Sequence, residues 1–210
     1  MLLKEIVYHL PDVLSRHEKD VLKRSINSLA SGEKINYARY FDDGSGKLPT
    51  TQLSQGDVYD GLPHITLPVT LPLNEIPDRP CMVLSNSCAV TTDNSKALPG
   101  RVLYAPVIRL SKFEGLLPAK SRRELIADIR KQIPMNYFYL PAQQPEYEES
   151  VVLFDHMLSI NSDIFSPDEL AARTRYKLSL EGWYHLLIKL SAYFTRVTNE
   201  TVAERQLKRS

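Results

Sequence analysis

Short runs of β-branched and aliphatic residues, separated by Pro, Gly and Asn, fill the middle of the chain. The runs are residues 56–60, 64–71, 81–85 and 101–110. Such runs are typical of short β-strands with turns between them. Prolines at positions 63, 68, 72, 77 and 80 surround the second run. Because proline cannot donate to a β-ladder, 64–71 is expected to be an edge strand or a long irregular loop.

Two helices are predicted on either side of this β region. Residues 12–30 place Leu22, Ile26 and Leu29 at steps of four and three, with Gly32 beyond them as a stop signal. Ser121 and Glu124 match a capping box, which predicts a helix near 120–132 inserted between strands.

The C-terminal part of the chain returns to strands and then to a helix. Runs 135–141 and 150–160 have the β pattern, SPDEL at 166–170 resembles a helix start, and RYKLSL follows as a short extended segment. In the last helix, 180–197, one apolar stripe is expected to pack on the sheet. The stripe contains Trp183, Leu187, Leu190 and Phe194.

These segments divide the chain into three parts. Residues 42–56 are rich in Gly, Ser, Thr and Asp and mark a boundary after an N-terminal helical arm at 1–50. A β domain is expected at 51–165, with its helical insertion near 120–132. Residues 166–210 then form a helical extension packed on that domain.

The composition limits the classes of function. The chain has 210 residues, of which 43% are hydrophobic, and a net charge of +1. This is a globular profile with no overall electrostatic attraction to nucleic acid. No apolar stretch approaches the ~20 residues of a bilayer span, and the N-terminus does not resemble a secretory signal. We therefore expect a cytoplasmic protein that does not cross a membrane.

Motifs for nucleotide and metal chemistry are not found in the sequence. It contains no phosphate-binding G-x-x-x-x-G-K-[ST] or G-x-G-x-x-G loop and no H-E-x-x-H pair, so we expect no cofactor and no metal. Cys81 and Cys88 are interpreted as free thiols. A zinc site of these cysteines with His64 or His156 is an alternative with unusually loose spacing.

Cys88 has two further interpretations. It lies in the polar turn SNSCAV, so it is either a small residue at a strand exit, which we favour, or an accessible nucleophile near His64 or His156. Asp155 and His156 are neighbours on a predicted strand. Their side chains would then point to opposite faces and would not act together.

Basic residues are concentrated at strand ends and on the inserted helix. Arg79, Arg101 and Arg109 flank strands, and Arg122 and Arg123 precede the aromatic run at 137–139. Arginines beside exposed aromatics can hold phosphates and stack on bases. Ordinary solvated charge explains the same residues, and we favour that interpretation.

The order of three motifs resembles the MazF/PemK toxin family. The motifs are GDV at 56–58, RPCMVLS at 79–85 and VLYAPVI at 102–108, and the match covers about residues 55–110. The resemblance implies an α+β protein. Its centre would be a small SH3-like β-barrel of the MazF/PemK type, carrying N-terminal, inserted and C-terminal helices.

The same resemblance implies a metal-independent ribonuclease that cuts single-stranded RNA. Arg79 matches the family's arginine, which would neutralise or protonate the departing phosphate oxygen. Ile108 stands where the family has a threonine, and isoleucine has no hydrogen-bonding group to offer a phosphate. Ser111 and Thr91 are nearby hydroxyls outside the motif position. The candidate residues for binding RNA or a partner are Arg79, Ser85, Ser87, Cys88, Arg101, Arg109, Arg122 and Arg123.

Two functional hypotheses follow. The first is a non-catalytic or weakly active MazF-like binding or regulatory module of a prokaryotic stress-response or defence system. Its partner would be a protein, such as a regulator, an antitoxin or a signalling protein, and a homodimer is compatible with it. The second is a working endoribonuclease toxin. We favour the first because replacing one of two key side chains usually lowers a rate by orders of magnitude.

Overall fold

The structure is a computed structural model that describes most of the central chain. The described residues are 14–31, 35–42, 53–63, 78–86, 100–143, 147–162, 169 and 172–195. The predicted run at 64–71 and the start of the predicted helix at 166–168 lie outside them. The described part contains these strands: β1 Val58–Pro63, β2 Asp78–Val83, β3 Arg101–Arg109, β4 Tyr137–Leu140, β5 Ser150–Leu153, β6 Leu158–Asn161 and β7 Thr174–Tyr176.

Four α-helices and two 3₁₀ turns accompany the strands. They are α2 Arg16–Ser31, α4 Leu110–Leu116, α5 Ala119–Arg130, α7 Leu180–Thr195, η1 Tyr37–Arg39 and η3 Phe154–His156. The α+β class is therefore confirmed. None of the helices in the described ranges is long and apolar enough to span a membrane.

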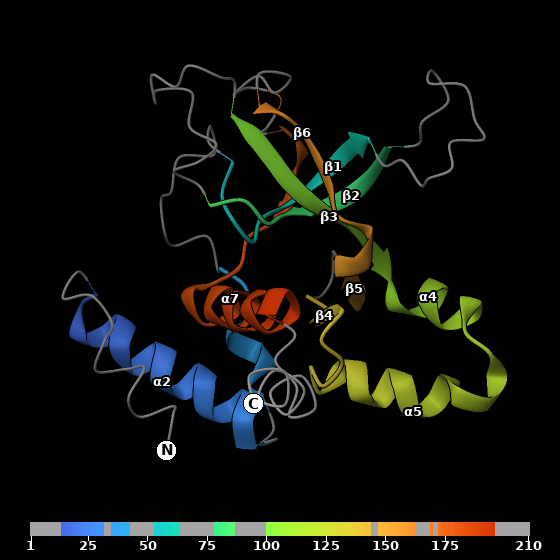
Figure 1. The fold of residues 1–210 in the computed structure, drawn as a ribbon, viewed down its shortest axis with the longest axis horizontal. Helices are drawn as coiled ribbons and strands as arrows, with labels where there is room; N and C mark the ends of the chain where they lie inside the picture. Colours follow the sequence, from blue (N-terminus) through green and yellow to red (C-terminus); the bar gives the residue numbers. More distant parts are fainter. Residues whose placement is uncertain are drawn as a thin grey trace, which may run out of the picture.

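The seven strands form one antiparallel sheet around β3. Its order is β4-β5-β3-β2-β1-β7, and β6 pairs with β3 beside this path. One edge of β3 pairs with β5 through 107–109 and with β6 through 101–104. The chain passes from β5 to β6 through η3, so both strands share that edge (Figure 1). Within the described residues no pairing joins β4 to β7, and the sheet is open there.

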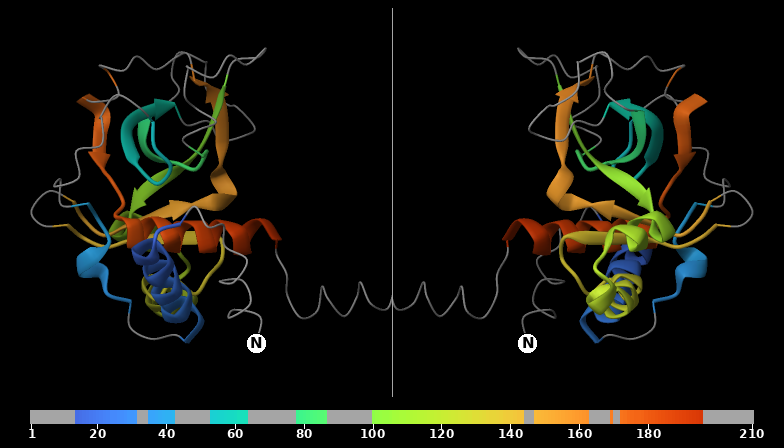
Figure 2. Two further views of the ribbon diagram at one scale, coloured as in Figure 1. Left: turned by 90° about the vertical axis from the view of Figure 1, so that its left-hand side faces the viewer. Right: turned by 90° about the vertical axis from the view of Figure 1, so that its right-hand side faces the viewer.

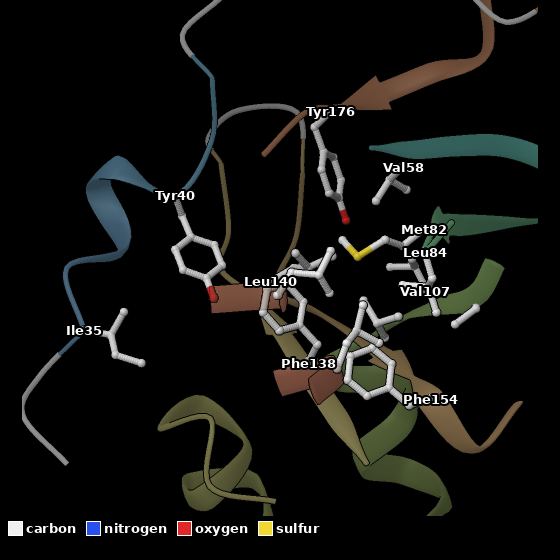
Figure 3. Packing of buried hydrophobic residues seen from close by; sticks show 14 residues of the cluster. Ile35, Tyr40, Val58, Met82, Leu84, Val107, Phe138, Leu140, Phe154 and Tyr176 are labelled. Carbon is white, nitrogen blue, oxygen red and sulfur yellow. The ribbon is translucent and has the colours of Figure 1, made fainter. Parts of the chain in front are cut away.

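The main core lies between the sheet and α7. Alternate residues of the strands, including Val58, Met82, Val107 and Phe138, are buried together with Leu186 of α7 (Figure 3). The two ribbon views of Figures 1 and 2 both place α7 between the strands and α2. This alternation is the period of two that a half-buried strand requires.

Two further apolar clusters flank the main core. The opposite face of β1, β2 and β3 buries a second cluster, which includes Tyr59, Cys81 and Tyr104. A third cluster lies between α4, α5 and strands β4 and β5, with Phe113 and Ile129 at its centre. The inserted helices are therefore anchored to the sheet by their apolar sides.

The predicted N-terminal helix is confirmed as α2, and a capping box starts it. The Ser15 amide donates to Glu18 Oε2 at 2.7 Å, and the Glu18 amide donates to Ser15 Oγ at 3.2 Å. Each residue thus satisfies a backbone donor that the first turn would leave unpaired. The helix packs its apolar side, with Val21, Leu22 and Ile26, on α7.

The predicted capping box of the inserted helix is wrong. Helix α5 begins at Ala119, two residues before Ser121, and its N-cap residue Pro118 makes no side-chain capping bond. Proline fixes its own φ near the helical value, which lets the chain start a helix without a polar cap. A second helix, α4, precedes it and was not predicted.

The predicted apolar stripe of the last helix is only partly correct. Leu190 is buried in the main core, but Phe194 is 61% exposed. Trp183 and Leu187 pack towards α2 rather than the sheet. Because α2 covers the other side of α7, the apolar surface of α7 is wider than one stripe, and both Leu186 and Leu190 pack in the core with the strands.

Candidate functional site

Arg79 lies on β2 at the edge of the predicted site. It pairs with Leu62 of β1, and its side chain is half-buried. Cys81 of β2 pairs with Pro106 of β3, and the pairing of these antiparallel strands runs from there to Val83 and Tyr104. Arg79 and Ile108, the two positions that the resemblance singled out, therefore lie beyond the paired part of β2 and β3, at the same end of it.

Ile108 is a packing residue. It pairs with Val151 of β5, and its side chain lies against the apolar cluster under α4 and α5. An aliphatic side chain in this position offers no hydrogen bond to a phosphate beside Arg79.

Ser85 and Arg101 are used inside the protein. Ser85 Oγ accepts a bond from the Leu103 amide at 2.6 Å, which clamps the end of β2 to β3. The Arg101 guanidinium donates to Ser159 Oγ, the Ser159 carbonyl and Asn161 Oδ1 at 3.0, 2.9 and 3.2 Å. Both side chains therefore hold strands together, and using Arg101 on a ligand would release β6.

Arg109 and the helix arginines lie at the opposite end of β3. Arg109 is 3.5 Å from Glu148, and both side chains are more than 60% exposed, so this pair contributes at most about 1 kcal/mol. Arg122 Nη2 donates to the Leu117 carbonyl at 2.8 Å and joins α4 to α5. Arg123 is exposed on the outer side of α5.

The predicted site residues do not form a single cluster. Arg79 of β2 and Ser85, two residues after β2, are six residues apart, which is about 20 Å in extended chain. Arg101 and Arg109 are eight residues apart, or about 26 Å. Since β2 and β3 are antiparallel, Arg79 lies near the Arg109 end of the sheet, and Ser85 lies near the Arg101 end (Figure 1).

Several predicted residues cannot be placed in this geometry. Ser87, Cys88, Thr91 and His64 lie outside the described residues. Cys81 carries a thiol rather than a disulfide and is fully buried in the second apolar cluster. In the described ranges no group of three or more His, Cys, Asp or Glu side chains could hold a metal ion.

The prediction for Asp155 and His156 was wrong. They belong to the 3₁₀ turn η3 and not to an alternating strand. Asp155 instead joins two elements, because Asn136 Nδ2 and Tyr193 OH donate to its two carboxylate oxygens at 2.9 and 3.0 Å.

A buried carboxyl group at the start of β1 was missed by sequence reasoning. Asp57 is only 4% exposed, Tyr59 OH donates to its Oδ2 at 3.4 Å, and Lys177 Nζ lies 4.0 Å away. Burial raises the pKa of Asp57 to about 7, although Lys177 opposes this. The Asp57 main chain also pairs with Val83, which fixes the carboxyl between β1 and β2. The Gly-Asp pair of the GDV motif was the sequence feature that could have indicated this carboxyl group.

A buried polar network under α7 was also missed. Gln132 has a positive φ of 60°, and its side-chain amide bonds both the amide and the carbonyl of Tyr139 at 3.1 and 2.8 Å. Lys189 Nζ donates to the carbonyls of Gln132 and Pro134, and burial lowers its pKa to about 8. The amide occupies the free edge of β4, as a paired strand would. This network therefore holds β4, the turn after α5 and α7 together.

His185, one helical turn before Lys189, has a similar structural position. Its Nε2 is 3.0 Å from Ser28 Oγ, and its ring lies 5.4 Å from the Tyr40 ring. Burial lowers the pKa of His185 to about 4, so the imidazole is neutral near pH 7. The sequence signal for these two buried polar residues was their spacing, since His185 and Lys189 lie at i and i+4 among apolar residues of α7.

Comparison with known proteins gives no assignment: no protein-family model and no curated protein matches the chain. The geometry and the motif resemblance are therefore the basis of the functional argument.

Proposed function

We propose that this chain is a MazF/PemK-like module that has lost ribonuclease catalysis and binds a protein partner. In this proposal its sheet derives from the SH3-like barrel of that family, and the protein acts in a prokaryotic stress-response or defence system. The antiparallel order around a long central strand, which pairs with β5 and β6 on one edge, supports the kinship.

One observation carries the loss of catalysis. Ile108 occupies the position of the family's threonine, and its side chain packs against the cluster under α4 and α5. A hydroxyl beside Arg79 would have to come from another residue, and Ser85 is already bonded to the Leu103 amide. An arginine alone can neutralise phosphate charge but cannot supply the second contact.

A metal-independent endoribonuclease is the second candidate. It is favoured by the Arg79 side chain, for which the described residues provide no hydrogen bond or ion pair. A half-buried cation without an internal partner is available to a phosphate. Arg109 lies at the same end of the sheet and would add positive charge.

Cleavage of a long single-stranded RNA in chelator separates the two candidates. We expect no cleavage by the wild type or by Arg79→Ala. The informative pair is Ile108→Thr and Ile108→Val, because both introduce a smaller β-branched side chain and only threonine adds a hydroxyl. Cleavage by Ile108→Thr alone would support descent from an active enzyme. Cleavage by the wild type that disappears in Arg79→Ala would refute the proposal and establish the ribonuclease.

A further inference from the structure

The α4–α5 hairpin, residues 109–131, concentrates positive charge. It carries seven basic and three acidic side chains, a local charge of +4, whereas the whole chain has a net charge of +1. The rest of the molecule is therefore acidic on balance, and the hairpin is the part with an electrostatic preference for an anionic partner.

Four of these cations have no ion-pair partner in the part of the chain that the structure describes. Lys112, Lys120, Arg123 and Lys131 are exposed, and none takes part in an ion pair within the described residues. On α5, Lys120 and Lys131 share one face at a spacing of eleven residues, with Arg123 beside them. Glu124 lies on the same face, so the surface is positive but not uniformly so.

The hairpin is held rigidly against the sheet. Phe113 of α4 and Ile126 and Ile129 of α5 are buried under it. Arg122 joins the two helices through the Leu117 carbonyl, and Arg130 binds Glu149 through two bonds of 3.2 and 2.7 Å. A rigid surface loses little entropy on binding, which favours its use for recognition. Figure 1 shows the hairpin at the side of the sheet, away from α2.

An exposed leucine distinguishes between two kinds of anionic partner. Leu116 is 72% exposed, more than any other large hydrophobic residue with described burial, and it lies one helical turn after Lys112. Phe113, the aromatic residue of the hairpin, is not available for stacking, since it is buried and packs edge-on against Tyr137. Single-stranded RNA is held by stacking on exposed aromatics, whereas a protein segment offers apolar side chains to a leucine.

From this charge and this leucine we infer that the outer face of the α4–α5 hairpin docks an acidic segment of the partner protein. Carboxylates of that segment face Lys112, Lys120, Arg123 and Lys131, and one of its apolar residues covers Leu116. The inference rests on the proposed protein-binding function and assigns that function to this surface.

Peptide binding by the full-length protein tests the inference. The probe is a labelled synthetic peptide of alternating Glu and Leu pairs, compared with the same peptide carrying Ala for Leu and with an oligouridylate of equal charge. The hairpin variant is Lys120→Glu/Arg123→Glu/Lys131→Glu. Its matched control, Arg16→Glu/Lys23→Glu/Arg24→Glu, reverses three exposed cations on α2 and changes the net charge equally. Thermal unfolding of both variants verifies that they fold.

We expect the Glu-Leu peptide to bind the wild type most tightly. The hairpin variant should weaken this binding about tenfold or more, and the α2 variant should change it less than about twofold. Leu116→Ser should weaken it about threefold or more, whereas Ile133→Ser, at another exposed apolar residue, should not.

Three results would overturn the inference. They are equal losses in the hairpin and α2 variants, hairpin-dependent binding of oligouridylate that exceeds binding of the peptide, and no binding of the peptide at low salt. The proposed function fails on a different measurement, Arg79-dependent RNA cleavage, so the two failures are distinguishable.

Discussion

Replacing Asp57 by Asn is expected to make the protein more stable above pH 7. The carboxyl group is almost completely buried at the start of β1, and its surroundings provide little to stabilise a charge. Tyr59 OH is at 3.4 Å and Lys177 Nζ at 4.0 Å, both long for strong contacts, and Asp42 adds a like charge. Asparagine has the same shape and carries no charge.

The size of the effect follows from the pKa of Asp57. Burial raises this pKa from 3.8 to about 7. Between these values the folded protein keeps a proton that the unfolded chain releases, so the free energy of unfolding falls as the pH rises through this window. At about 1.4 kcal/mol for each pH unit, the total loss is about 4 kcal/mol above pH 7. Asp57→Asn has no proton to release and avoids this loss.

Urea unfolding at about pH 4 and about pH 8 measures the difference. The free-energy gap between Asp57→Asn and the wild type should be small at the lower pH and should grow by several kcal/mol at the higher pH. Asp60→Asn is the matched control on the same strand. It breaks a half-exposed ion pair with Arg175, for which we expect less than about 1 kcal/mol. A loss of stability in Asp57→Asn at pH 8 would refute the reasoning, because it would mean that the charged carboxylate is stabilised by Lys177.

Four further substitutions test the packing of the helices and of the β2–β3 pair. Gly182→Ala should destabilise the protein by about 2 kcal/mol or more in thermal unfolding, since the new Cβ would lie 2.4 Å from the Tyr40 carbonyl oxygen. Gly115→Ala has open space around its Cβ and should stabilise α4 by up to about 1 kcal/mol in the same measurement. Lys189→Met should cost about 2 kcal/mol in urea unfolding, because two carbonyls of the turn after α5 lose their donor. Ser85→Ala should lower the free energy of unfolding by about 1 kcal/mol, because the Leu103 amide loses the hydroxyl to which it donates. Hydrogen exchange at that amide should become faster, and unchanged exchange would contradict the clamp between β2 and β3.

Local sequence signals were sufficient for the elements that have them. The steps of four and three in α2 and the β-branched run of β3 correspond to the observed helix and strand. Helix α4 was missed because it continues directly from β3 with no Gly, Pro or polar cap between them. The run 150–160 was predicted as one strand for a similar reason, since η3 interrupts it without a Gly or Pro.

The site was less predictable because its contacts join distant parts of the chain. The partners of Arg101 are 58 and 60 residues away in the sequence. From the sequence, an arginine at a strand end was therefore a candidate for binding a ligand, whereas the structure shows that it links β3 to β6. The buried Asp57 carboxyl contacts Tyr59 of β1 and Lys177, which follows β7 and is 120 residues further along the chain. Residue type and spacing report which groups are present, but the fold decides which of them already have partners.

The arginines differ in how many bonds within the protein they would lose on turning to a ligand, and this difference determines where an anionic ligand can bind. Arg101 gives up three hydrogen bonds if it turns to a ligand, and Arg122 gives up the bond that joins α4 to α5. Each such bond contributes about 1 kcal/mol, so recruiting either residue would weaken the fold that presents it. Arg79 and Arg123 give up no bond to the described residues, and Arg109 gives up only an exposed pair. Anion binding is therefore expected at the Arg109 end of β3 and along the hairpin that continues from it, and not at the end marked by Ser85 and Arg101.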